Sequence, residues 1–145
     1  MSLHLIKLCV GVETIQDLRD WIEENETHYR RLGREYEQTH TTRMVPKRGD
    51  ELLDGGSLYW VIKGQVACRQ RLLAITPFTD GQGIGRCRLR LDPLVVPVEP
   101  RPYRPFQGWR YLADKDAPPD LGDGAKGAED MPESLRRELA ALGLL

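Results

Sequence analysis

Arginine is the residue in this sequence whose positions point most directly to a chemistry. Sixteen of the 21 basic residues are arginine. Five of them alternate along two segments that have the composition of β-strands, and alternate residues of a strand share one face. A guanidinium is a planar fork of N–H donors that suits phosphate groups and the edges of bases. If the two segments are neighbours in a sheet, they form a cationic patch consisting of Arg69, Arg71, Arg86, Arg88 and Arg90.

Aromatic and further basic residues lie close to these segments in the sequence. Bases stack on aromatic rings when a protein binds single-stranded nucleic acid. We therefore expect the binding surface to include Tyr59, Trp60, Tyr103 and Trp109, together with Arg43, Lys47 and Arg48. The alternative is that the arginines solvate the outside of the fold and form exposed ion pairs, each worth only about 0–1 kcal/mol.

The basic residues are concentrated in the middle of the chain. Residues 1–38 contain 5 Lys/Arg and 8 Asp/Glu, residues 39–110 contain 12 and 6, and residues 111–145 contain 4 and 8. The net charge of −1 therefore conceals a middle segment of +6. Because the total is near zero, long-range nonspecific attraction to DNA is not expected. The distribution favours a localised anionic partner.

A second set of residues has the types that hydrolysis uses. His40 lies in a segment without helical or strand periodicity, and Asp50 and Glu51 follow it closely. An imidazole transfers protons near neutral pH, and one or two carboxylates commonly hold Mg²⁺ beside substrate phosphates. These residues are the catalytic candidates for an alternative function, a small hydrolase acting on a nucleotide-like substrate. The simpler interpretation is structural, with Asp50 capping a short helical turn before a turn at residues 54–56.

The remaining motifs predict neither a metal nor a cofactor. No spacing of histidine, cysteine and carboxylate residues indicates the three or four convergent ligands of a metal site. The segment GQGIG lacks the lysine and the strand–loop–helix context of a phosphate-binding loop. Three cysteines without a C-x-x-C pair indicate buried thiols rather than a disulfide framework.

The location expected from the sequence is the cytoplasm, without membrane contact. No apolar segment reaches the roughly 20 residues that span a bilayer. The first ten residues carry Lys7 within their apolar part and lack a small-residue cleavage site, so they do not have the pattern of a secretory signal.

The 145 residues predict a single domain. Its first elements are a strand over residues 3–10 and a helix that Thr14 caps, with apolar residues at helical spacing over 15–37. The helix is either long or broken near Asn25, because asparagine competes with the helical backbone. Residues 38–54 show no period and predict a connecting loop.

The rest of the chain predicts a series of strands. Residues 57–63 and 65–75 form a hairpin through the turn Lys63-Gly64, and strands follow over 85–91, 94–98 and 109–112. Residues 113–130 are linker-like or irregular, and a short helix ends the chain. The predicted class is α+β: a mixed, mainly antiparallel β-barrel or curled sheet with an N-terminal helix and a short C-terminal helix.

Two resemblances extend this interpretation. The segments SLHLIKLCVGVETIQDL and RMVPKRGDELLDGGSLYWVIKGQVACRQRLLAI resemble a bacterial family of about this length that is catalogued only as a domain of unknown function. That resemblance covers nearly the whole chain and implies no catalytic residues. The order of elements is also similar to that of PUA-like domains such as ASCH and EVE, in which a strand and a helix precede Gly-Asp and a strand pair.

The pieces that match the PUA-like order are the strand over 3–10, the helix from Ile15, Gly49-Asp50 and the strands from Leu58 to Ile75. The long insertion over residues 23–48 departs from that pattern. The PUA-like resemblance implies a β-barrel that binds nucleic acid or modified nucleotides, although a fold does not fix a function.

The leading functional interpretation is therefore a small cytoplasmic binding module. It recognises RNA or a nucleotide-like anionic ligand through strand arginines and aromatic residues. The small hydrolase is the enzymatic alternative. A third is a protein-interaction adaptor that uses its acidic C-terminal tail.

Overall fold

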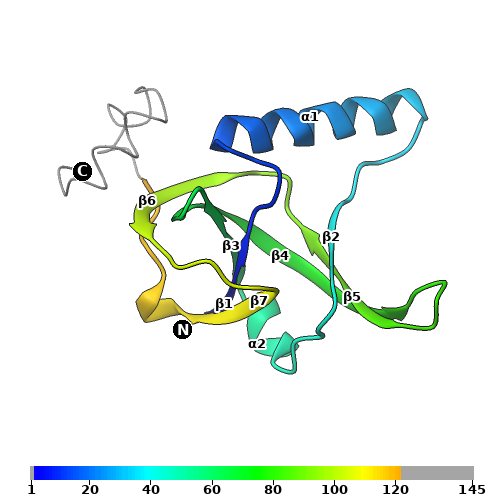
Figure 1. Cartoon of the computed structure of the whole chain (residues 1–145). Helices are drawn as coiled ribbons and strands as arrows, with labels where there is room; N and C mark the ends of the chain where they lie inside the picture. Colours follow the sequence, from blue (N-terminus) through cyan, green and yellow to red (C-terminus); the bar gives the residue numbers. More distant parts are fainter. Residues whose placement is uncertain (1, 122–145) are drawn as a thin grey trace.

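The computed structural model describes residues 2–121 and shows a mixed, seven-stranded, curved sheet with one long helix across it (Figure 1). Its elements in chain order are β1 (Leu3–Leu8), α1 (Ile15–Arg31), β2 (Gln38–Thr42), α2 (Gly49–Leu53), β3 (Ser57–Ile62), β4 (Gln65–Thr79), β5 (Gly85–Leu91), β6 (Val96–Pro102), β7 (Trp109–Ala113) and the 3₁₀ helix η1 (Asp114–Asp116). The predicted α+β class is confirmed.

The strands follow the order β2-β5-β4-β3-β1-β7, and β6 pairs with the first half of β4. In the described part of the chain β1 and β3 are parallel and the other strand pairs are antiparallel. The edge strands β2 and β7 are not paired with each other within residues 2–121, so the sheet does not close. The barrel alternative is therefore wrong, and the sheet is open.

Both faces of the central strands are buried. All six residues of β3 are buried, and those of β1 divide between two apolar clusters, with Leu3 and Leu5 in one and Ile6 in the other. Strand β1 ends at Leu8, two residues before the limit expected from the sequence. The larger cluster lies under α1, which contributes Ile15 and Leu18. Burial on both sides explains why β3 is almost continuously apolar.

The first helix begins as predicted but is shorter. The Thr14 hydroxyl accepts a hydrogen bond from the Asp17 backbone N–H at 3.0 Å, which satisfies one of the free donors of the first turn. Asn25 does not break the helix, which is continuous from Ile15 to Arg31. The Asn25 side-chain amide donates to the Trp21 carbonyl at 2.7 Å. The helix ends at Arg31, and Gly33 follows with a φ of 69°, the left-handed conformation that glycine supplies after a helix.

The predicted loop over residues 38–54 is wrong in two places. Residues 38–42 form strand β2, because their backbone pairs with β5 over the register Gln38↔Leu91 to Thr42↔Cys87. Residues 49–53 form the short helix α2, which contains the expected helical turn. The predicted cap is wrong, because the N-cap position is Arg48 and Asp50 lies within the first turn. A polar strand of five residues has no periodicity that separates it from a loop. Its partner decides its conformation.

The later strands agree with the sequence except at their limits. The hairpin of β3 and β4 is confirmed. Lys63 and Gly64 both have a positive φ, as the two central residues of a type I′ turn require. Strand β4 continues to Thr79, into the segment expected to be loop. Strand β6 spans Val96–Pro102 instead of 94–98, and its prolines fit because β4 is its one strand partner among the described strands.

The end of the described chain is held against the sheet. An isolated bridge joins Val98 to Asp120, and the expected linker-like segment begins with the last residue of β7 and η1. The predicted C-terminal helix and residues 122–130 of that segment lie outside the described residues. On the other side, the Trp109 indole N–H donates to the Met44 carbonyl at 2.8 Å, so side chains link β7 to the chain after β2.

No helix within residues 2–121 is long and apolar enough to cross a membrane.

Candidate ligand pocket between β1, α1 and β2

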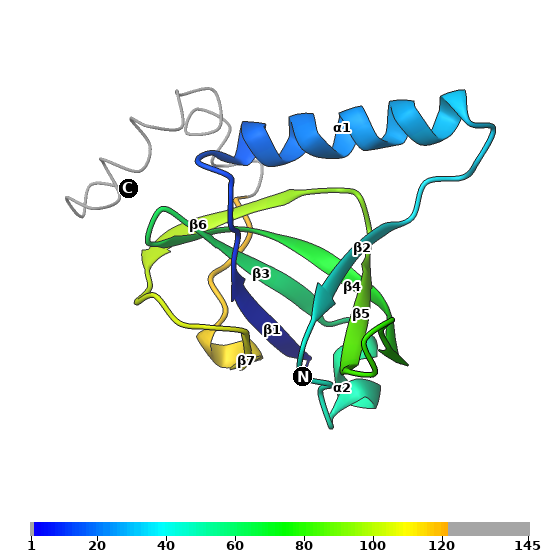
Figure 2. The ribbon, with the colours of Figure 1, turned by 45° about the vertical axis from the view of Figure 1, so that its right-hand side comes forward.

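A pocket of about 430 Å³ lies between the end of β1, the loop after it, α1 and β2. In Figure 2, α1 runs across the top of the sheet and the chain then descends through β2 beside β5. Strands β1 and β2 are not paired in the described chain, so backbone pairing does not close this space. Its volume is within the range of about 300–1,000 Å³ typical of small-ligand sites. The polar and aromatic lining includes Lys7, Gln38, Thr39, His40, Trp21 and Trp60.

Lys7 brings a positive charge to this pocket. It follows Leu3 and Leu5 along the face of β1 that lies under the helix. The side chain is half-buried, and none of the ion pairs among residues 2–121 involves it. Burial lowers the pKa of Lys7 from its usual value, because desolvation disfavours the ammonium form. A cation without a counter-charge beside apolar walls is suited to binding an anionic group.

His40 contributes a neutral imidazole to the same pocket. Its ring packs edge-to-face on Trp60, with 5.2 Å between centroids. Burial, and secondarily the charge of Lys7, lower the pKa of His40 to about 4, so the ring is uncharged at neutral pH. The Nε2 atom is buried and has no hydrogen-bond partner among the described residues. Buried polar atoms without partners are rare, and each calls for an explanation such as an absent ligand.

Three side chains and one carbonyl form a hydrogen-bonded network on this side of the pocket. Gln70 has no exposed surface, and its Oε1 accepts from the Trp60 indole N–H at 2.9 Å and from Gln38 Nε2 at 3.1 Å. Its own amide donates to Gln38 Oε1 at 2.7 Å and to the Asp92 carbonyl at 2.9 Å. The Gln70 amide therefore fixes the indole on which the His40 ring packs.

The buried imidazole predicts acid sensitivity. The pKa of His40 falls from 6.5 to about 4 on folding, so between these values the unfolded chain binds more protons than the folded chain. The His40 contribution to stability is thus present above pH 6.5 and is lost as the pH falls toward 4. We expect the wild type to lose about 2 kcal/mol more than His40→Gln over this window, a value reduced for partial solvent screening.

Urea unfolding at a series of pH values measures this difference. The matched control is His28→Gln, which changes an exposed histidine on α1 and should retain the wild-type pH dependence. Parallel stability curves for wild type and His40→Gln between pH 7 and pH 4 would contradict the assignment.

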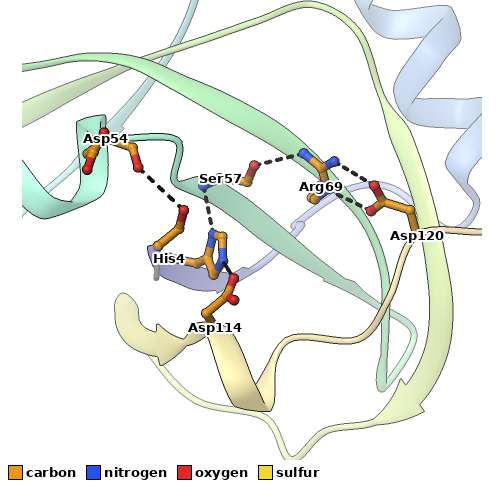
Figure 3. A network of polar contacts seen from close by, with 7 residues as sticks. His4, Asp54, Ser57, Arg69, Asp114 and Asp120 are labelled. Atoms are coloured by element: carbon orange, nitrogen blue, oxygen red, sulfur yellow. Dashed lines mark hydrogen bonds and ion pairs between the residues drawn. The ribbon is translucent and has the colours of Figure 1, made fainter.

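A second polar network lies on the other side of β1 and β3 (Figure 3). The His4 Nε2 atom bonds Asp114 at 2.8 Å, and Nδ1 accepts the Ser57 backbone N–H at 3.0 Å. Arg69 donates to the Ser57 hydroxyl at 3.0 Å and to both carboxylate oxygens of Asp120. Serine, histidine and aspartate are all present, but the imidazole bonds the serine backbone and not its hydroxyl. The network joins segments of the fold and lacks the geometry of an activated nucleophile.

The arginines of β5 project outward as predicted. Cys87, Leu89 and Leu91 are buried, and the intervening arginines are exposed or half-buried. Their described contacts are Asp80 with Arg86 at 2.6 Å, the Phe78 ring with Arg88 at 4.6 Å and Glu37 with Arg90 at 3.6 Å.

The arginines of β4 form a separate group. Pairing of β4 with β5 begins at Leu72, whereas Arg69 and Arg71 lie before that point, beside β3. Arg69 is engaged by Asp120 at 2.7 Å, and Arg71 is exposed. The five arginines are therefore distributed over two regions of the sheet.

The four predicted aromatic residues also separate. Tyr59 and Trp60 are both buried and belong to different apolar clusters, so they face opposite sides of β3. Tyr103 packs edge-to-face on Phe106, and Trp109 lies near the chain after β2. Of these four, Trp60 is the one that lines the pocket.

The remaining candidates lie between β2 and β3. Arg43 and Lys47 are exposed, Arg48 pairs with Glu51, and Asp50 is exposed on α2. None of these residues lines the pocket that contains His40. The structure therefore does not bring the three catalytic candidates together. Within residues 2–121, no group of three or more histidine, cysteine or carboxylate side chains is placed to hold a metal ion.

Comparison with known proteins assigns the chain to a family. The family model described as "Protein of unknown function (DUF1489)" matches residues 5–145. The chain belongs to this family. The predicted resemblance to a family of unknown function is thus confirmed. The matched residues of this DUF1489 chain include all of those that line the pocket. No curated protein and no solved structure matches it. The likeness to PUA-like domains stays a prediction.

Most of this site in the DUF1489 chain has no signal in the sequence. In the sequence Lys7 is only a charge inside an apolar segment, and nothing distinguishes Trp21 from a residue that packs at the edge of the apolar stripe of the helix. Instead, Trp21 is 47% exposed and lines the pocket. Gln38 and Gln70 gave no signal, since glutamine is ordinarily a surface residue. The available indication for Lys7 is its place on the strand face that it shares with Leu3 and Leu5.

Proposed function

We propose that this chain is a small binding module for a nucleotide-like anionic ligand, held in the pocket between β1, α1 and β2. The observation that carries the proposal is Lys7, a half-buried cation in that pocket with no ion-pair partner among the described residues. A phosphate or carboxylate would supply the missing charge and form a charge-assisted hydrogen bond.

The rest of the lining supports a flat, partly apolar ligand body. Two indoles border the pocket, and Trp21 is exposed enough to receive a stacked ring. His40 Nε2 offers a hydrogen bond that the fold leaves unmade, and Gln38 keeps amide capacity beyond its bonds to Gln70. Anionic, aromatic and hydrogen-bonding groups occur together in nucleotides. The proposal retains the ligand class expected from the sequence and moves its first contact from the strand arginines to Lys7.

Binding of uridine monophosphate (UMP), of uridine and of the corresponding adenine compounds tests the proposal. We expect at least one monophosphate to bind about tenfold more tightly than its nucleoside, the value of one charge-assisted hydrogen bond. Lys7→Met should abolish that difference. Trp21 and Trp60 line the pocket, so quenching of tryptophan fluorescence provides a readout in addition to calorimetry.

The matched control is Lys115→Met, which removes an exposed lysine of η1 outside the pocket and should leave both affinities unchanged. Equal binding of nucleoside and monophosphate, or an undiminished preference in Lys7→Met, would exclude this role for Lys7. Failure of all four compounds to bind at millimolar concentration would exclude the proposed function.

A further inference from the structure

Strand β2 separates the pocket from an arginine-bearing face of the sheet. Gln38 and His40 point to the pocket side, and the alternate residues Thr39 and Thr41 are exposed. Thr39 also lines the pocket, so it stands at the rim. Strand β2 is an edge strand in the described sheet. A ligand that leaves the pocket therefore has to cross only this one strand to reach the outer face of the sheet, the face that carries the arginines of β5.

The register of β2 and β5 places two arginines next to that rim. Thr39 is opposite Arg90 and Thr41 is opposite Arg88. Cross-strand partners of an antiparallel pair lie about 4.5–5.5 Å apart, with their side chains on the same face. Arg90 is therefore a cation directly beside the rim. Arg88 follows two residues along β5, a further step of about 6–7 Å on the same face.

The present contacts of these arginines leave them open to phosphate. Arg90 and Glu37 are 3.6 Å apart and both about half exposed, at 44% and 56%, so their attraction is weak and replaceable. The Arg88 guanidinium carbon lies over the Phe78 ring, 4.6 Å from the ring centroid. None of the ion pairs among residues 2–121 involves Arg88, so no carboxylate competes with a phosphate for its N–H donors.

The other strand arginines with carboxylate partners are more firmly engaged. Arg86 bonds Asp80 at 2.6 Å, and Arg69 bonds both oxygens of Asp120. The outer face beside the pocket is thus a short track whose two cations are Arg90 and then Arg88.

We propose that the pocket receives the terminal nucleotide of a single-stranded nucleic acid, whose phosphodiester backbone continues over β2 at Thr39 onto Arg90 and Arg88. This inference rests on the proposed function, because the pocket must first accept a nucleotide. It names the ligand as an oligonucleotide end rather than a free nucleotide. Arginine forms two-pronged hydrogen bonds with phosphate, which suits successive phosphates of an extended strand.

The experiment compares the affinity of UMP with that of short oligouridylate RNA and oligothymidylate DNA for the full chain. We expect the better of the two strands to bind at least about tenfold more tightly than UMP. The double variant Arg88→Glu/Arg90→Glu should lose this gain and keep UMP affinity unchanged. Oligonucleotide binding by the double variant should also depend less on salt. In a plot of the logarithm of the binding constant against the logarithm of the salt concentration, its slope should be less negative by about 1 to 2.

Two further variants sharpen the test. Glu37→Gln removes the carboxylate that competes for Arg90 and should raise oligonucleotide affinity about two- to threefold without affecting UMP. The charge-matched control Arg101→Glu/Arg104→Glu changes two exposed arginines outside β5 and should leave the oligonucleotide gain intact. Lys7→Met should weaken UMP and oligonucleotide alike.

Two failures are distinguishable. If UMP binds but neither strand binds more tightly, or the gain survives Arg88→Glu/Arg90→Glu, the oligonucleotide inference is overturned and the nucleotide pocket stands. If neither the nucleosides, the monophosphates nor any strand binds, the proposed function fails and this inference fails with it.

Discussion

Replacement of Gln70 by leucine is expected to lower the free energy of unfolding by about 3 kcal/mol. Gln70 is completely buried and bonds Gln38, the Trp60 indole and the Asp92 carbonyl. Leucine is similar in size but offers no polar atom, so these three groups would remain buried without that partner. Each such loss costs about 1–3 kcal/mol, and the costs are not fully additive because the groups share one network.

The measurement for Gln70→Leu is urea unfolding, with Gln16→Leu as control. Gln16 is exposed on α1 and bonds only Asp20 among its described side-chain contacts, so its loss should cost less than about 0.5 kcal/mol. The double variant Gln38→Leu/Gln70→Leu should be less destabilised than the sum of the single variants, because it removes both members of the amide pair. Strict additivity would show that the pair does not act as a unit.

The Gln70→Leu variant should also have a functional consequence. Gln70 orients Trp60, and Trp60 packs against His40 in the pocket. Under conditions where Gln70→Leu is still folded, we expect weaker binding of the proposed nucleotide. The Lys7-dependent preference for phosphate should persist, since Lys7 is on β1 and makes no bond to this network among the described contacts.

The second large effect is expected for Gly56→Ala, which should destabilise the fold by about 3 kcal/mol or more. A methyl group at Gly56 would overlap the backbone carbonyl oxygens of Leu3 and Leu52. Backbone cannot move aside as a flexible side chain can. Gly56 also donates its N–H to the Leu52 carbonyl at 2.9 Å and accepts the Leu72 N–H at 3.0 Å. The clash therefore affects α2, β1 and β4 together.

Gly81→Ala provides the comparison for Gly56→Ala. A Cβ atom added at Gly81 would have no atom within 4 Å, and Gly81 does not have a positive φ, so alanine should be tolerated there. The midpoint of urea unfolding and the yield of folded protein measure the difference. Similar midpoints for the two variants would mean that the backbone around Gly56 relaxes without cost, contrary to the packing described.

Local features of the chain determined much of the secondary structure. The Thr14 cap begins α1, the Lys63-Gly64 turn joins β3 to β4, and strict alternation marks β5, all as the sequence predicts. Each signal depends on residues that are neighbours along the chain, through a capping bond, a permitted φ or the two-residue period of a strand. The two faces of β1 were determined in the same way.

Tertiary pairing decided what the local patterns left open. Strand β2 has no periodicity of its own and exists because its backbone pairs with β5. The extension of β4 to Thr79 has the same cause, since β5 is its partner there. Whether the sheet closes depends on contacts between strands far apart in sequence, β2 and β7, which no local pattern encodes.

The candidate site likewise depends partly on the sequence and partly on the tertiary structure. The sequence determined the residue types, including His40 and Trp60, a basic middle segment and outward arginines on β5. Only the tertiary structure decided that Lys7 and His40 line one pocket and that Gln38 and Gln70, 32 positions apart, bond to each other. The physical reason is that the pocket arises where β1 and β2 remain unpaired beneath α1, and this geometry belongs to the assembled sheet.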